Sequence, residues 1–342
     1  MKRLKYLLVF VLPIATYISF TSLGVLTYLP AFIVFGIVPL LELFFKADSK
    51  NFDKETTQLE KENNLYSWIL YLTVPVQIGI LIVYFYAIQE ALTNAEYIGR
   101  IVSMGLLCGI LGINVGHELG HRQNKTSQFL GELMLLTSLN THFLPYHNGG
   151  HHFNVATPTD AATARINEPL YLFWIRSHFS SYKQAWQLEI KRLRIKNIIS
   201  LQNKMVNYTI TNVLVLFLIY YFFGWFVLLS FILASIIGIL QLETVNYIEH
   251  YGLLRQKNAY GRYEKVRHHH SWNSDHIIGR LLLFNLSRHS DHHYNGSKPY
   301  QVLKSIPESP QMPTGYPGMM ILALIPPLWF KQMNAKINNF QH

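Results

Sequence analysis

Histidine is the residue type that dominates the possible chemistry of this chain. Nine of its sixteen histidines fall into four groups, and each group lies at or just beyond one end of an apolar segment. Imidazole nitrogen suits zinc, copper, nickel and iron, so this grouping indicates a metal site. The nine are His117 and His121, then His147, His151 and His152, then His250 alone, and finally His289, His292 and His293.

The spacing within each group predicts which rings face the same ion. His117 and His121 are four residues apart, so on a helix they project from one face about one turn apart. In HNGGHH the adjacent pair His151 and His152 points at two different ions, and His147 shares one of them; HSDHH repeats the doublet. Nine imidazoles exceed what one tetrahedral zinc uses, whereas two ions with four or five nitrogens each would use them all.

Two simpler interpretations apply to some of the histidines. HELGH matches the HExxH pattern of zinc proteases, in which Glu118 would be the general base, but a protease site has no use for the three further groups. The single residues His142 and His178 are interpreted as packed side chains. The run 268–270 is left open between a ligand, a neighbour of the ligands and a solvated basic loop.

The elements that must position these histidines are membrane helices. Half of the 342 residues are hydrophobic and 14% are charged, and a helix needs roughly 20 apolar residues to cross the hydrocarbon core. The sequence therefore predicts an all-α integral membrane protein, a single domain over 1–342 with a cytoplasmic-side histidine-rich site. The six predicted transmembrane segments are 5–22, 24–45, 68–91, 99–117, 205–222 and 226–248.

The basic residues predict the orientation of these segments. Nearly all Lys and Arg lie before the first segment, in 46–67, in 118–204 and after 249, so these parts should share the cytoplasmic face together with both termini. The net charge of +10 is then explained without a nucleic-acid partner. Segment 126–146 must not cross the membrane, because a crossing would separate His147 from His117. The broken run 318–330 is assigned to the interface.

The chemistry that nine imidazoles support beside a membrane is redox chemistry. A metal transporter is a remote alternative, because transport sites use few ligands held weakly near the bilayer midplane. Iron is favoured among the metals, since it reacts with O2 where an apolar substrate already partitions. The one cysteine, Cys108, excludes a cysteine-ligated iron domain within this chain, so another protein must bring electrons.

Three histidine groups spaced H-x3-H, H-x3-HH and H-x2-HH, with an N-x3-H, resemble the superfamily of membrane fatty acid desaturases, hydroxylases and alkane monooxygenases. The flanking residues NVGHELGHR, GGHHFNVATPTDAATAR, NYIEHYGLLRQ, HSWNSDH, RHSDHH and PTGYPG are similar to bacterial alkane 1-monooxygenases, from about residue 35 to 330. The HYG element separates alkane and xylene monooxygenases from desaturases. One departure is Gly149, where family members more often carry Lys or Arg.

This resemblance implies a specific enzyme. It implies that the nine histidines named above are the ligands of two non-haem iron ions, with O2 as co-substrate. It implies terminal hydroxylation of linear alkanes that enter from the membrane lipid, in the bacterial inner membrane. Electrons would come from rubredoxin, a separate chain, and its NADH-dependent reductase. A xylene-type methyl hydroxylase, or an acyl-chain hydroxylase or desaturase, is the alternative on the same scaffold.

Carboxylates near the histidine groups are predicted to hold the ligand rings. Metal-bound imidazoles usually donate their other N–H to a carboxylate or a carbonyl. The acidic residues close to the groups in sequence are Glu118, Asp160, Glu249 and Asp291, with Glu243 as a further candidate. Arg165 and Arg288 are the cations that would balance them.

Overall fold

The computed structural model describes residues 3–197 and 202–341. The regular elements of this part of the chain are helices, accompanied by two isolated β-bridges, Lys257 with Tyr263 and Asn273 with Gln311. Contacts divide the chain into two compact units, and the single domain stays a prediction. Unit 1 comprises Met1–Gly36, Asn64–Pro145 and Ala185–Leu242, and unit 2 comprises Ile37–Asn63, Tyr146–Gln184 and Glu243–His342.

Most helices belong to one unit. Those of unit 1 are η1 (Leu4–Phe10), α1 (Val11–Thr21), η2 (Gly24–Tyr28), α2 (Leu29–Phe32), α5 (Leu65–Ala87), α6 (Asn94–Leu107), η4 (Cys108–Ile113), α7 (Asn114–Gly120) and α8 (Lys125–Leu136). Those of unit 2 are α3 (Val38–Phe44), α4 (Lys54–Glu62), η5 (His147–His151), α10 (His152–Asn154), η7 (His268–His270), α13 (Ile277–Leu282), α14 (His289–Tyr294), η8 (Tyr300–Val302), α15 (Tyr316–Ala323) and α16 (Pro326–Gln341). Four helices contribute to both units: η3 (Ile33–Ile37), α9 (Phe143–Tyr146), α11 (Leu170–Lys196) and α12 (Lys204–His250).

Five of the described helices are long and apolar enough to cross a membrane, so the chain is an integral membrane protein. They are Leu4–Thr21, Gly24–Phe44, Leu65–Ala87, Asn94–Gly120 and Lys204–His250. The first four correspond to the first four predicted segments, with ends that differ by a few residues. The fifth, α12, contains both the fifth and the sixth predicted segments. The structure has five candidate helices where the sequence predicts six segments, because the last two predicted segments lie in one helix, α12.

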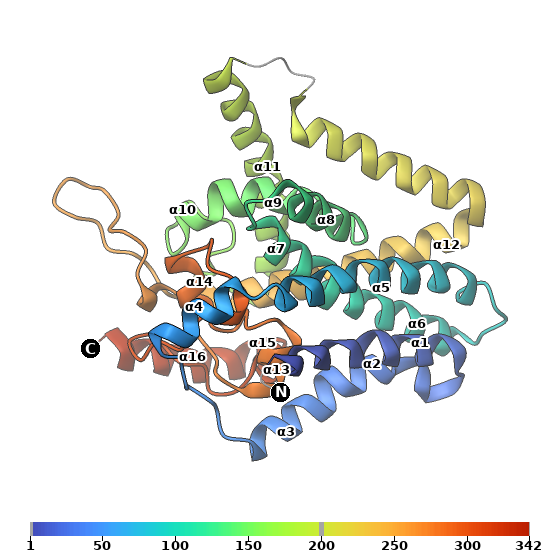
Figure 1. The fold of residues 1–342 in the computed structure, drawn as a ribbon, viewed down its shortest axis with the longest axis horizontal. Coiled ribbons are helices and arrows are strands. Elements are labelled where there is room, and N and C mark those ends of the chain that lie inside the picture. The colour runs from blue at the N-terminus through green and yellow to red at the C-terminus, as the bar shows by residue number, and fades with distance from the viewer. Residues whose placement is uncertain (1–2, 198–201, 342) are drawn as a thin grey trace. The chain divides into compact units, whose positions relative to one another are not determined.

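Helix α12 is broken near its middle at Gly224. The backbone of Gly224 has φ 82° and ψ 178°, a conformation that is readily available to glycine and costly for other residues. Figure 1 shows α12 reversing its direction at one point between its two limbs. The predicted tight turn at Phe223 to Trp225 thus coincides with the break in the helix.

Two apolar stretches that were expected not to cross the membrane form short helices. In 126–146, α8 has 12 residues and ends at Leu136, and α9 begins only at Phe143. A helix of that length spans about 18 Å, which is less than the hydrocarbon core of about 30 Å. In 318–330, α15 ends at Ala323 and α16 begins at Pro326. Neither stretch is among the candidate spans in the described chain.

In unit 1, glycines allow the helix that carries the first histidine pair to pack closely. A Cβ at Gly105 would lie 2.6 Å from the Ile237 side chain, and one at Gly109 would lie 2.0 Å from Gln241. Facing them, a Cβ at Gly238 would lie 2.9 Å from the Cβ of Cys108. Small residues at such a contact let two helix backbones approach in a membrane, where van der Waals packing drives association. The segment from α6 into η4, which leads to α7, therefore packs closely against the second limb of α12.

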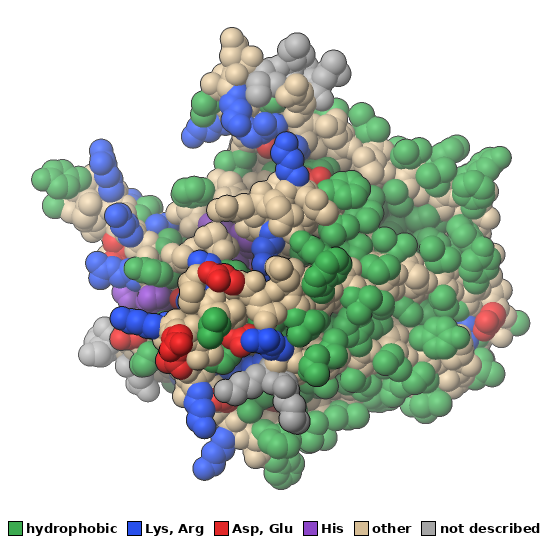
Figure 2. All heavy atoms as spheres, viewed as in Figure 1, with side chains coloured by type: hydrophobic (Ala, Val, Ile, Leu, Met, Phe, Trp, Pro, Cys, Tyr) green, Lys and Arg blue, Asp and Glu red, His purple; other side chains and the backbone are tan. Residues whose placement is uncertain are grey.

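Hydrophobic side chains cover the outside of the long helices. Phe217, Tyr221, Phe222 and Trp225 on α12 are all exposed. Figure 2 shows hydrophobic side chains gathered over α5 and α12. Exposed apolar surface of this extent is what contact with lipid acyl chains requires.

In unit 2, a buried arginine fixes the start of the helix that carries the last histidine group. Arg288 precedes α14, and its guanidinium donates to the Asp275 carboxylate at 3.1 Å and to the carbonyl of Leu303 at 2.7 Å. It also donates to the carbonyls of Asp48 and Lys50, both at 3.1 Å. These bonds tie three separate segments to the residue before His289.

Candidate metal centre

Four buried histidines of unit 2 converge from three elements. His151 lies in η5, His250 ends α12, and His289 and His293 belong to α14. Their ring nitrogens lie within 4.8 Å of one another, and all four residues are buried. We call these residues the four-histidine group. A cluster of neutral imidazoles at this spacing is suited to hold one metal ion.

The distances within the four-histidine group fit a shared ion. The Nε2 atoms of His151 and His293 are 3.2 Å apart, and those of His250 and His289 are 3.1 Å apart. Metal–imidazole bonds of about 2.1 Å would place two bound nitrogens about 3.0 Å apart at right angles and about 3.4 Å apart at tetrahedral angles. Burial, and after it the neighbouring imidazoles, hold the pKa of His293 well below its usual value. A neutral ring offers a lone pair to a metal.

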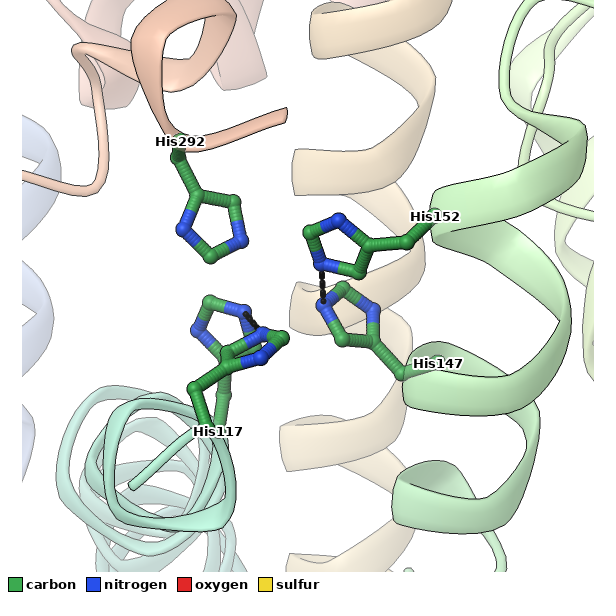
Figure 3. Close-up of side chains that lie close together, drawn as sticks. His117, His147, His152 and His292 are labelled. Carbon is green, nitrogen blue, oxygen red and sulfur yellow. Dashed lines mark hydrogen bonds between the residues drawn. The ribbon is translucent and has the colours of Figure 1, made fainter. Parts of the chain in front are cut away.

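Three further histidines of unit 2 form a second set, which we call the three-histidine group. They are His147, His152 and His292, and their ring nitrogens lie within 4.8 Å of one another. The Nε2 atoms of His147 and His152 are 3.0 Å apart. Figure 3 shows the rings of His147 and His152 meeting at these nitrogens, with the ring of His292 facing them from another helix. His152 is partly exposed, whereas the whole four-histidine group is buried.

A π-helix explains how one short segment serves both groups. Residues His147–His151 form the π-helix η5, whose backbone hydrogen bonds join residues five apart. His147 therefore pairs with His152, five residues on, and His151 turns to the four-histidine group. The adjacent pair points at two different groups, as HNGGHH predicts. His292 and His293 divide in the same way, as HSDHH predicts.

The pair His117 and His121 lies in unit 1. His117 is in α7, and His121 directly follows that helix. Their Nε2 atoms are 3.1 Å apart, which is the spacing that i and i+4 positions predict for two ligands of one ion. A second π-helix, η4, immediately precedes α7 in the chain. Single π-turns inside α-helices are frequent at functional sites.

Asp160 holds one ring of the four-histidine group in a defined state. The Nδ1–H of His151 donates to its carboxylate oxygens, at 3.0 and 3.1 Å, which leaves the Nε2 lone pair facing the other three rings. Tyr146 and Thr163 donate their hydroxyls to the same carboxylate, each at 2.7 Å. Burial alone would raise the pKa of Asp160, but the hydrogen bonds from His151, Thr163 and Tyr146 help to lower it to about 2. Asp160 is therefore an anion at neutral pH.

Glu249 also contacts the four-histidine group. One of its carboxylate oxygens lies 3.2 Å from Nε2 of His289, and the other accepts a hydrogen bond from the Tyr316 hydroxyl at 2.7 Å. Glu249 and Tyr316 are each about 1% exposed. A carboxylate beside a ring nitrogen that faces the metal position adds one negative charge to an otherwise neutral donor set.

Two of the remaining predicted carboxylates contact cations. Glu118 accepts from Arg122 at 2.8 Å, and Asp291 pairs with Lys298 and accepts from the backbone N–H of Lys304 at 2.6 Å. Their roles beside the ligand rings stay predictions. Glu243 lies 4.0 Å from Nδ1 of His178.

Sequence reasoning missed the hydroxyl groups that support the carboxylates. These are Tyr146, Thr163 and Tyr316, which bind Asp160 or Glu249. Two signals were present in the sequence, because Tyr146 directly precedes HNGGHH and Tyr316 is the tyrosine of PTGYPG. Neither signal identifies the carboxylate partner. Asp160 lies 14 residues from Tyr146, and Glu249 lies 67 residues from Tyr316.

A third cluster contains part of the histidine run. Glu264, His269 and His270 place ligand-type atoms within 4.8 Å of one another beside a cavity of about 550 Å³. The backbone N–H of Arg267 donates to Nδ1 of His270 at 3.0 Å. A neutral imidazole carries only one N–H, so the proton of His270 must lie on Nε2, which points at the Glu264 carboxylate 3.4 Å away. This arrangement does not suit a metal ligand.

The family of the chain follows from comparison with known proteins. The family model described as fatty acid desaturase matches residues 96–322, which include all nine histidines, so the chain is a desaturase-like membrane protein. It is 40% identical to alkane 1-monooxygenase 1 of Pseudomonas aeruginosa, over 90% of this chain and 82% of that protein. It is 38% identical to alkane 1-monooxygenase of Pseudomonas putida, over 94% of this chain and 80% of that protein. The chain belongs to the alkane 1-monooxygenase family.

A less similar relative is named for a different oxidation. The hydroxylase component XylM of a xylene/toluene monooxygenase from Pseudomonas putida is 30% identical, over 76% of this chain and 70% of that protein. The resemblance seen in the sequence motifs is thus confirmed, including its extension to xylene monooxygenases.

Proposed function

We propose that this chain hydroxylates the terminal carbon of linear alkanes with O2, at two iron ions held by the nine histidines. The single observation that carries the proposal is the buried four-histidine group in a chain that is 40% identical to a protein named alkane 1-monooxygenase. One iron belongs to the four-histidine group. The sequence resemblance alone assigns the other iron to ligands among the remaining five histidines.

The donor chemistry supports two separate sites. The nearest nitrogen pairs in the histidine sets are 3.0 to 3.2 Å apart, which is the spacing of neighbouring ligands on one ion. Nitrogen donors of this kind suit iron as well as zinc, copper and nickel. Iron is preferred because the named relatives are monooxygenases.

The residues of the chain place and protect the reacting groups. When bound, the two irons supply the redox chemistry that activates O2 and breaks an unactivated C–H bond. Asp160 keeps the Nδ1 proton of His151 in place, and Arg288 fixes the start of the helix that carries three ligands. The buried four-histidine group lies away from bulk water, which limits the access of competing reactants. An alkane offers no polar group, so only the shape of an apolar path can select its terminal carbon.

The membrane arrangement follows from the charge distribution. We propose six crossings, with the two limbs of α12 counted separately on either side of Gly224. The histidines and both termini then face the cytoplasm of a bacterial cell, and the chain resides in the inner membrane. Rubredoxin, reduced by its NADH-dependent reductase, is the proposed electron donor.

Product and metal analysis of the purified protein test this function. The protein in detergent or nanodiscs should hold two irons per chain. With 18O2, reduced rubredoxin and octane or hexadecane, it should form the 1-alkanol with one labelled oxygen. Xylene offered in parallel distinguishes the alternative on the same scaffold. Benzyl alcohols or alkenes as the sole products would overturn alkane hydroxylation, and exchangeable zinc in place of iron would overturn the diiron site.

A further inference from the structure

A basic loop projects from unit 2 immediately after the last membrane-spanning helix. Residues 255–267 contain five cations and one carboxylate, a net charge of +4. The cations are Arg255, Lys257, Arg262, Lys265 and Arg267, and all except Arg255 are exposed. Figure 1 shows this segment extending away from the helices as a narrow loop. At the same place in Figure 2, basic side chains lie along the projection and a hydrophobic side chain lies at its tip.

The basic loop has a defined shape. The backbone N–H of Asn258 donates to the carbonyl of Arg262 at 2.9 Å, and the N–H of Glu264 donates to the carbonyl of Gln256 at 3.0 Å. The ammonium of Lys257 lies 5.1 Å from the ring centre of Tyr263. At the tip, Tyr260 is 88% exposed. A preformed, exposed loop loses little conformational entropy when it binds a partner.

The base of the basic loop adjoins the residues next to the proposed ligands. The guanidinium of Arg255 donates to the carbonyl of Phe153 at 2.7 Å, and Phe153 directly follows His152. His268, at the other end of the loop, stacks on Tyr294 with ring centres 4.3 Å apart, and Tyr294 directly follows His293.

Two exposed aromatic rings therefore lie beside the ligand-bearing helices. Phe153 is 72% exposed and Tyr294 is 61% exposed. His152 itself is partly exposed, unlike the four-histidine group. Aromatic side chains with arginine nearby are typical of the residues that dominate protein–protein binding.

We propose that the basic loop and the rings of Phe153 and Tyr294 form the docking surface for a small acidic one-electron carrier protein, and that electrons enter the site beside His152. This inference rests on the proposed function, which needs a reductant from another protein. Positive charge on the loop complements an acidic carrier and speeds its encounter. A lipid surface is disfavoured, because the loop lacks the continuous apolar face of a membrane-binding segment.

The electron balance requires two visits by the carrier in each catalytic cycle. One C–H bond of the alkane and the O–O bond of O2 break, and one C–O bond forms. One oxygen atom enters the alcohol and the other leaves as water, which consumes two protons and two electrons. Each reduced carrier is oxidised by one electron, so a docking surface that allows rapid exchange serves turnover better than one that binds permanently.

Neutralising the basic loop tests the docking surface. The triple variant Lys257→Gln, Arg262→Gln, Lys265→Gln should raise the KM for a reduced rubredoxin about tenfold at low ionic strength, with a smaller effect in high salt. The matched control is Lys191→Gln, Arg194→Gln, Lys196→Gln, which also removes three positive charges, here from the exposed end of α11. The control should keep the parent KM. Equal KM values for the two variants would overturn the docking surface.

A second reductant separates this inference from the proposed function. Turnover driven by dithionite with a small viologen mediator does not need the docking surface, so the loop variant should match the parent in that assay. Loss of mediator-driven turnover and iron in the loop variant would show a structural role and would overturn the inference. Weaker binding of the loop variant to anionic vesicles, with an unchanged KM for rubredoxin, would assign the loop to lipid instead. Failure of the parent to hydroxylate alkanes with either reductant would contradict the proposed function itself.

Discussion

Two histidine clusters of unit 2, the four-histidine group and the cluster that contains His269 and His270, differ in their hydrogen bonds. In the four-histidine group, His151 donates its Nδ1 proton to Asp160, so its Nε2 is free of a proton and faces other imidazoles. In the run 268–270, Nδ1 of His270 accepts the backbone N–H of Arg267, so the proton lies on Nε2 and faces Glu264. Burial, followed by the nearby His269, lowers the pKa of His270 to about 4, so this ring is also neutral at pH 7.

The difference teaches that the hydrogen bond made by Nδ1, the ring nitrogen that points out of the cluster, decides whether the other nitrogen can bind a metal. When Nδ1–H donates to an acceptor, Nε2 carries no proton and its lone pair can bind a metal. When Nδ1 instead accepts a hydrogen bond, the proton of the neutral ring lies on Nε2 and that lone pair is lost. The number of histidines in a cluster does not make this distinction.

The largest effect should come from removing a ring of the four-histidine group. His250→Ala should lose one iron per chain and nearly all alkane hydroxylation, a loss greater than the about 10–100-fold that removal of a ligand's hydrogen-bond partner costs. Metal analysis and product formation measure the two effects. His269→Ala is the matched control and should retain both irons. Equal loss of iron from both variants would contradict the conclusion that only the four-histidine group of these two clusters binds iron.

A smaller effect should follow from removing the acceptor behind a ligand ring. Asp160→Asn takes away the negative charge that orients His151 and should weaken iron binding about 10–100-fold. Chelator titration of the iron-loaded protein measures this affinity. The corresponding change in the other cluster, Glu264→Gln, should leave iron binding as it is in the parent. Unchanged iron affinity in Asp160→Asn would contradict the role given to the carboxylate.

The smallest effect should come from His270. The variant His270→Ala leaves the backbone N–H of Arg267 without its acceptor, at a cost of about 1 kcal/mol. The midpoint of thermal denaturation in detergent should fall by about 2–4 °C, with both irons retained. Loss of iron from this variant would show that the ring belongs to a metal site after all.

Much of the histidine arrangement could be predicted from spacing. The doublets 151–152 and 292–293 divide between two groups because adjacent side chains on a helix point in different directions. The membrane segments could also be located, because about 20 apolar residues leave few other interpretations. The exact ends of the segments depend on helix capping and packing, and the break at Gly224 depends on a single backbone conformation.

The rest depends on contacts that spacing does not encode. Tyr316 meets Glu249 across 67 positions of the chain. The proton position on His270 is set by the backbone N–H of Arg267, which no side-chain pattern reveals. The π-helix at His147–His151 likewise follows from packing, although it determines which rings share a group.

That π-helix has a consequence for the evolution and engineering of the segment. Deleting one residue between His147 and His151 would restore ordinary α-helical pairing and turn the two doublet rings toward the wrong partners. Substitutions at Asn148 or Gly149 keep the count of residues and therefore keep this division. The segment should thus tolerate amino-acid substitutions far better than insertions or deletions. Libraries aimed at new substrates should therefore substitute residues there and keep the length of the segment.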